Sequence, residues 1–156
     1  LLERVFGGDQ VLRGQFLVPS GDYPAAIQHY TAAVQGYPGY RALVYDHANV
    51  LLLSGDSDAA LKTVEARLRD HPDDTQLYLL QSRAYAAQGK RLLQHKAQAE
   101  AYARQGRIGA AVEQLQIAAR SGDGDFYQLS SVEARLRELR VQLKALEKER
   151  KQQPQP

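Results

Sequence analysis

The stretch RALVYDHANVLLLSGDSDAALKTVEARLRDHPDD, residues 41–74, contains a complete pair of predicted helices and the turn between them. Gly55 lies near its middle and begins the turn segment GDSDAALKTV. Pro72 closes the stretch, because a proline cannot continue a preceding helix and biases the residue before it away from helical geometry. The stretch therefore predicts one antiparallel helix pair that ends at His71-Pro72.

The same arrangement recurs along the chain at a fixed interval. Gly21, Gly55 and Gly89 stand 34 residues apart, and Gly106 follows after 17. Small residues come five places after three of these glycines, and they are Ala26, Ala60 and Ala111. Small side chains let helices approach closely, and a period of this length is typical of stacked helix pairs. The last step of 17 residues requires one helix, about residues 91–104, to serve two consecutive units.

These residues resemble the tetratricopeptide repeat (TPR) family over roughly residues 7–122, most closely over 41–74. The resemblance implies an all-α fold, a TPR-type alpha-solenoid of antiparallel helix hairpins over residues 1–124. Its parts are units at about 7–40, 41–74 and 75–91, the shared helix 91–104 and a further helix at 108–120. Membership of this family implies a function in protein binding.

The family pattern also assigns individual positions. In the unit at 41–74 it places inward-facing residues at Val44, His47, Ala48, Leu51, Ala60 and Val64. Arg67 stands where the pattern expects a small residue, so we expect its aliphatic stem along the neighbouring helix and its guanidinium in solvent. In the first unit Gly14 fits the pattern, and Pro19 is expected to end the first helix early.

A longer apolar stripe follows the loop SGDGD at 121–125. Its members recur at spacings of 3, 4, 3, 4 and 3, and they are Leu129, Val132, Leu136, Leu139, Leu143 and Leu146. A C-terminal capping helix over 125–150 fits this stripe, because a terminal repeat needs a polar outer face. A dimeric coiled coil permits the same spacing, but the stripe has only the minimum length for one, which favours capping. We expect a disordered tail at 151–156.

Composition narrows the classes of function. The 156 residues are 44% apolar and 24% charged, which is ordinary for one globular domain. Residues 1–124 contain thirteen Lys and Arg and thirteen Asp and Glu, and this neutral balance argues against nucleic acid as the main ligand. No stretch has the length of a membrane span. The absence of cysteine removes disulfides and thiol chemistry. Because the chain begins at Leu1 and contains no methionine, we expect a fragment or a mature form.

The sequence shows no catalytic constellation, so we expect no enzymatic activity and no cofactor in this chain. Its four histidines form no His-Glu-x-x-His pair. The segment Asp123-Gly124-Asp125 resembles the start of a calcium loop but lacks the later ligands, which favours a flexible turn. Acidic residues before helix starts are expected to cap free backbone N–H groups, and they are Asp56, Asp58, Asp73 and Asp74.

A narrower resemblance covers about residues 76–140. The run QAEAYARQGRIGAAVEQLQIAARSGDGDFYQLSSVEARLREL at 98–139 resembles the C-terminal TPR domain of bacterial periplasmic zinc metalloproteases of the beta-barrel assembly-enhancing protease type. The resemblance implies a periplasmic protein of the bacterial envelope, with a zinc-dependent catalytic domain upstream of Leu1. The implied partners are that protease domain, the outer-membrane barrel-assembly machinery and unfolded barrel proteins, in a chaperone-like role. No zinc ligand of that family can be placed on a residue of this chain.

In a solenoid of helix hairpins the first helix of each unit lines the concave face, which is the expected contact surface. The register places six partner-binding candidates there: Tyr45, Asn49, Leu52, Arg83, Lys96 and Glu100. Tyrosine and arginine are favoured interface anchors. The alternative is that these side chains are only solvated. An acidic C-terminal peptide is not an expected ligand, because the positions of the basic clamp that holds one are Tyr45, Gln76 and Leu80 here.

Two functions follow from the sequence. The first is a docking and substrate-presenting TPR domain of an envelope metalloprotease that serves quality control of outer-membrane protein assembly. The alternative is a free-standing TPR adaptor that oligomerises through the C-terminal helix.

Overall fold

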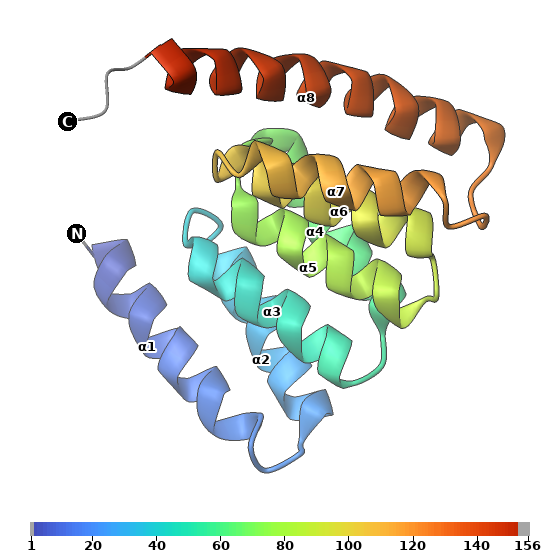
Figure 1. Cartoon of the computed structure of the whole chain (residues 1–156). Coiled ribbons are helices and arrows are strands. Elements are labelled where there is room, and N and C mark those ends of the chain that lie inside the picture. Colours follow the sequence, from blue (N-terminus) through green and yellow to red (C-terminus); the bar gives the residue numbers. More distant parts are fainter. Residues whose placement is uncertain (1, 153–156) are drawn as a thin grey trace. The chain divides into compact units, whose positions relative to one another are not determined.

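The computed structural model describes the backbone of residues 2–152 and the side chains of that range other than 2–6 and 16. All regular structure in residues 2–152 is α-helical, which confirms the all-α prediction (Figure 1). The helices are α1 (Leu2–Leu17), α2 (Tyr23–Gly36), α3 (Arg41–Leu53), α4 (Ser57–Asp70), α5 (Thr75–Ala87), α6 (Arg91–Arg104), α7 (Ile108–Ala119) and α8 (Phe126–Gln152).

The chain divides into two compact units, and the division falls directly after Pro72. Unit 1 is residues 1–72 and contains α1–α4, in which consecutive helices pack together and α1 also contacts α3. Unit 2 is residues 73–156 and contains α5–α8, in which α6 contacts α5, α7 and α8. The contacts of α8 thus place it in the same compact unit as α5, α6 and α7.

The regularly spaced glycines lie in the turns that end helices. Gly21, Gly55, Gly89 and Gly106 have φ angles of 75°, 88°, 71° and 74°, in the left-handed region that glycine enters without a steric cost. At Gly55 the chain ends α3, and the Asp56 N–H donates to the Leu51 carbonyl at 2.9 Å. The Asp56 carboxylate then accepts from the Ala59 N–H at 3.0 Å and caps α4. One Gly-Asp pair therefore closes one helix and starts the next.

The helix bounds agree closely with the pattern. The expected shared helix is α6 at Arg91–Arg104, and α1 ends at Leu17, before Pro19. The expected tail at 151–156 is wrong at its start, because Lys151 and Gln152 continue α8. The rest of that tail, 153–156, lies outside the described residues.

The segment Asp123-Gly124-Asp125 is a capping loop and not the flexible turn that we expected. The Asp123 carboxylate accepts from the backbone N–H groups of Arg91 at 2.5 Å and Leu92 at 3.0 Å, the first turn of α6. Hydrogen bonding to Ser121 and these two amides lowers the pKa of Asp123. Asp125 accepts from the Gln128 N–H at 2.8 Å and so caps α8. This short loop thereby fixes the starts of two helices.

The α8 stripe packs inside unit 2. Val132, Leu136 and Leu139 belong to one buried cluster with residues of α6 and α7, including Leu115. Leu129 and Leu143 pack against this cluster, whereas Leu146 is 39% exposed. The seam that a coiled coil would need is therefore largely occupied within the unit.

In the repeat at residues 41–74, most of the residues that were expected to face inward are buried. Val44, Ala48, Leu51, Ala60 and Val64 are buried, as the family pattern predicted.

Two polar residues of this repeat, His47 from the inward-facing set and Arg67, have different outcomes. His47 is half-buried and Nε2 lies 3.2 Å from Thr31 Oγ1, while burial lowers its pKa and favours the neutral ring. Arg67 is partly exposed and departs from the prediction only at Nε, which is buried and has no hydrogen-bond partner among the described residues.

Two glycines of α1 give a matched test of packing in unit 1. A Cβ on Gly14 would overlap Cζ and Oη of Tyr30, which is 1% exposed, whereas a Cβ on Gly8 would meet only Tyr40 Oη at 3.6 Å. We expect Gly8→Ala to stabilise unit 1 by up to about 1 kcal/mol through helix propensity. Gly14→Ala gains the same propensity but forces a rigid buried ring to move, for a net loss of about 1–2 kcal/mol.

Urea unfolding of the two variants, followed through the NMR methyl signals of Leu43 and Val50, checks this pair. Stabilisation by both substitutions would contradict the described contact between α1 and Tyr30.

Candidate functional site

The six predicted contact residues fall on three helices. Tyr45, Asn49 and Leu52 lie on α3 of unit 1 and are partly buried. In unit 2, Arg83 of α5 is exposed, and Lys96 and Glu100 of α6 are partly buried. Of these six, Lys96 and Glu100 line one cleft within unit 2, to which Arg83 does not contribute. Asn49 lines a separate hollow of unit 1 beside Tyr30 and Asp46.

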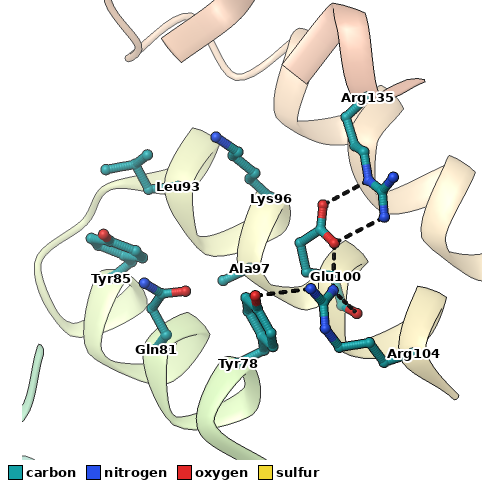
Figure 2. Close-up of a pocket in the computed structure, with 9 residues that line it drawn as sticks. All are labelled: Tyr78, Gln81, Tyr85, Leu93, Lys96, Ala97, Glu100, Arg104 and Arg135. Carbon is teal, nitrogen blue, oxygen red and sulfur yellow. Dashed lines mark hydrogen bonds and ion pairs between the residues drawn. The ribbon is translucent and has the colours of Figure 1, made fainter. Parts of the chain in front are cut away.

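The unit 2 cleft has a volume of about 510 Å³ and is formed by α5, α6 and α8 (Figure 2). The lining residues of α5 and of α6 lie mostly three and four positions apart, so each of these two helices contributes one face. The lining is Tyr78, Gln81 and Tyr85 from α5, Leu93, Lys96, Ala97, Glu100 and Arg104 from α6, and Arg135 from α8. We call this the α5–α6–α8 cleft.

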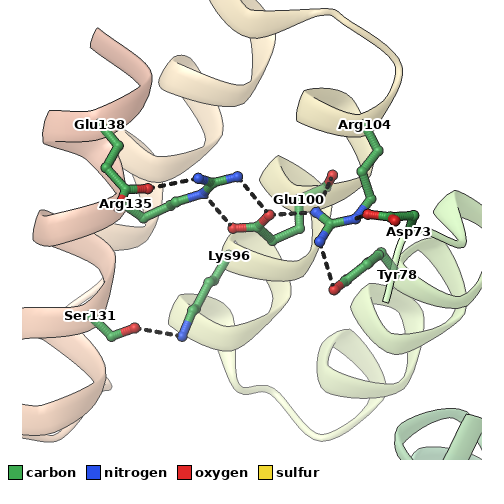
Figure 3. Close-up of polar contacts among 8 residues, drawn as sticks. All are labelled: Asp73, Tyr78, Lys96, Glu100, Arg104, Ser131, Arg135 and Glu138. Carbon is green, nitrogen blue, oxygen red and sulfur yellow. Dashed lines mark hydrogen bonds and ion pairs between the residues drawn. The ribbon is translucent and has the colours of Figure 1, made fainter. Parts of the chain in front are cut away.

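Glu100 lies at the centre of an ion-pair network that joins two helices (Figure 3). Its carboxylate accepts from Arg135 Nε at 2.9 Å and from Arg135 Nη2 at 3.1 Å, a two-point pairing with α8. The same carboxylate accepts from Arg104 Nη1 at 2.6 Å. Glu100 therefore holds two guanidinium groups beside the cleft and ties α8 to α6.

Further contacts orient these two arginines. Arg104 Nη2 donates to the Tyr78 hydroxyl at 2.9 Å, and its guanidinium carbon lies 4.1 Å from the centre of that ring. Arg135 Nη1 donates to Glu138 at 2.7 Å. Asp73 lies 3.9 Å from Arg104 Nε, but its side chain is 97% exposed, so this pair contributes little. Both guanidinium groups are thus held in place within the unit.

The network keeps Glu100 ionised. Burial by itself raises the pKa of Glu100, but hydrogen bonds from Arg135 and Arg104 and the two positive charges outweigh it, so the pKa lies below its ordinary value. The side chain is only 16% exposed. The carboxylate that we predicted as a partner contact is therefore engaged inside unit 2, where it positions Arg104 and Arg135.

Lys96 differs from the two arginines in its partner. Its ammonium group donates to Ser131 Oγ of α8 at 2.8 Å, and that hydroxyl is neutral (Figure 3). An ammonium has three N–H donors, so Ser131 orients Lys96 without neutralising it. Leu93, Ala97 and Tyr85 line the same cleft beside it (Figure 2). The cleft thus combines a cationic edge with an apolar and aromatic part.

Sequence reasoning missed Arg135, the α5 tyrosines and the loop that caps α6. Arg135 and Glu100 are 35 residues apart in the sequence, and a local sequence pattern cannot predict a contact between residues so far apart. A usable signal was its position in α8, three residues after Val132 and four before Leu139, which places it next to the buried stripe.

Two further features were sought among the described residues, a group of metal ligands and a membrane-spanning helix. Within residues 2–152, no group of three or more His, Asp or Glu side chains is placed to hold a metal ion. Every helix in the described range is too short or too polar to traverse a bilayer.

Comparison with known families identifies the type of helical repeat. Residues 17–84 match the family model described as tetratricopeptide repeat, a segment that includes α2, α3, α4 and most of α5. Together with the all-helical structure, this match defines a TPR-type helical repeat fold. Repeats of this family generally mediate protein–protein interactions and are typically not catalytic. No curated protein matches the chain at a significant level.

Proposed function

We propose that this chain is a protein-docking module and that the α5–α6–α8 cleft holds part of the partner. The carrying observation is the fixed geometry of the cleft, in which Glu100 and Tyr78 hold two arginine side chains in defined positions. Preorganised side chains lose less conformational entropy on binding. Tyrosine and arginine are also the side chains most often found to dominate interface energies.

The finer proposal concerns the parent protein. The run at 98–139, with its half-unit step and closing helix, supports a docking and substrate-presenting domain of an envelope zinc metalloprotease. On this proposal the chain is periplasmic and acts in outer-membrane protein assembly, with the barrel-assembly machinery and unfolded barrel proteins as partners. The coding sequence upstream of Leu1 tests it, because the proposal requires a His-Glu-x-x-His motif there.

A second candidate is an adaptor that oligomerises through α8. The burial of Val132, Leu136 and Leu139 within unit 2 weighs against it, because these residues would have to form the seam. Sedimentation equilibrium separates the two candidates. If the protein is a monomer at all concentrations, the adaptor that oligomerises through α8 is rejected.

Site-specific crosslinking tests the docking site itself. With a photoreactive phenylalanine at Gln81, which lines the cleft, we expect a crosslinked partner band in the cells that make the protein. The matched control places the same residue at Glu113, an exposed position of α7 outside the cleft lining. We expect the Gln81 band to be several times stronger, measured by immunoblotting. Equal yields from both positions would reject the α5–α6–α8 cleft as the docking site.

A further inference from the structure

We infer that the α5–α6–α8 cleft recognises an internal polypeptide segment that carries an acidic side chain close to an apolar one, with Lys96 contacting the carboxylate. This inference rests on the proposed function and adds the chemistry of the bound segment. Its three supports are the charge of the cleft lining, the neutral partner of Lys96 and the apolar residues beside it.

The charge of the lining favours an acidic ligand. Lys96, Arg104 and Arg135 contribute three positive charges, and Glu100 contributes the one carboxylate in the lining, which leaves an excess of two. Glu100 faces both guanidinium groups and is 16% exposed. This single carboxylate is engaged by the two arginines, whereas the described partner of Lys96 is the neutral Ser131 hydroxyl.

Acidic residues outside the lining reduce this excess only weakly. Glu138 pairs with Arg135 but is 65% exposed, and Asp73 is 97% exposed at 3.9 Å from Arg104. Water and salt screen such pairs. A ligand carboxylate that enters the cleft beside Lys96 would be less solvated and would interact more strongly than these two.

Lys96 is placed to accept such a ligand. Ser131 holds the ammonium at 2.8 Å through one of its donors, which reduces the rotamer freedom that a carboxylate would have to restrict. A salt bridge with the ligand would then add a charge-assisted hydrogen bond where the present partner is neutral.

The second part of the ligand follows from the neighbours of Lys96. Leu93 lies three residues earlier on the same face of α6, and Ala97 and Tyr85 also line the cleft. An apolar side chain on the bound segment can cover this surface while an acidic neighbour reaches Lys96. The proposal places the carboxylate on a side chain of the segment, and peptides with blocked ends test that choice.

Selection from a random dodecapeptide display library against the full chain tests the inference. Enriched peptides are resynthesised with acetylated and amidated ends, so that no terminal charge contributes. We expect Asp or Glu in the enriched sequences, and about tenfold weaker binding when that residue is changed to Asn or Gln. Lys96→Gln should cause a loss of the same size, with little further loss when both changes are combined.

Lys90→Gln is the matched control, because Lys90 is exposed next to α6 and does not line the cleft. Binding of neutral and acidic peptides with equal affinity, or an unchanged affinity in Lys96→Gln, would overturn the inference. If Gln81 still crosslinks a partner in that case, docking stands and only the acidic preference fails. Absence of enriched peptides together with absence of crosslinking would reject both proposals.

Discussion

An Ala60→Arg variant is expected to lose the packing of α4 on α3. Ala60 has no exposed surface, and it sits five places after Gly55, where the repeat keeps a small residue. An arginine at this position overfills the helix contact and buries a charge without a described partner. We expect unit 1 to be destabilised by about 3 kcal/mol or more, through both effects.

Hydrogen exchange measured by mass spectrometry on peptides from 41–70 reports this loss directly. The control is Lys62→Arg, which adds an arginine at an exposed position of the same helix and should leave protection unchanged. Wild-type protection in Ala60→Arg would show that α4 does not pack on α3 through this residue.

A Glu100→Gln variant is expected to weaken the attachment of α8 to α6. The glutamine cannot offset two positive charges, so Arg104 and Arg135 would remain close together and partly buried. We expect a loss of about 2–3 kcal/mol at pH 7, below the range for fully buried pairs because the arginines are partly exposed. Glu138→Gln is the control, and its exposed pair with Arg135 should cost less than about 1 kcal/mol.

The same residue predicts a pH dependence. Because the pKa of Glu100 is lower in the folded than in the unfolded chain, its stabilisation is complete above the ordinary value of 4.5 and is lost as the pH falls through the folded value. Unit 2 should therefore lose stability below about pH 4.5, and Glu100→Gln should lose less over the same range.

Urea unfolding followed through the methyl signals of Leu136 and Leu139 measures this dependence for unit 2. An identical pH slope in wild type and Glu100→Gln would contradict the central role of this carboxylate.

Unit 1 requires its own probe, because the contribution of Asp46 to stability changes with pH in the opposite direction to that of Glu100. Burial raises the pKa of Asp46, despite hydrogen bonds to Tyr30 and Gln15. Its protonated form is favoured on folding, so the contribution of Asp46 falls as the pH rises from 3.8 through its folded pKa. Burial and the Asp46 charge also raise the pKa of Tyr30 to about 12, so that hydroxyl stays protonated at neutral pH. A signal averaged over the chain would mix two opposite slopes.

Much of the local structure could be predicted because it depends on neighbouring residues. Gly55, Asp56 and Pro72 define where helices stop and start, since left-handed turns, caps and missing N–H donors act within a few residues. The interval between Gly89 and Gly106 likewise required the single helix that the structure shows as α6.

The site was predictable only in part. Helical register placed Lys96 and Glu100 on one face of α6, and both line the cleft. The register could not show that Glu100 turns to Arg135, or that Asp123 crosses back to cap α6. Both contacts join residues more than 30 positions apart, and their existence depends on how α8 and its loop fold back.

The sequence by itself determined the helices of this protein, their turns and the apolar face that each one buries, because hydrophobic period and backbone geometry are local properties. Only the tertiary structure decided what the charged residues do. An ion pair depends on a distance of a few ångströms between side chains, and packing of α8 against α6 sets that distance for Glu100, Arg104 and Arg135. The same packing places Lys96 next to the neutral hydroxyl of Ser131.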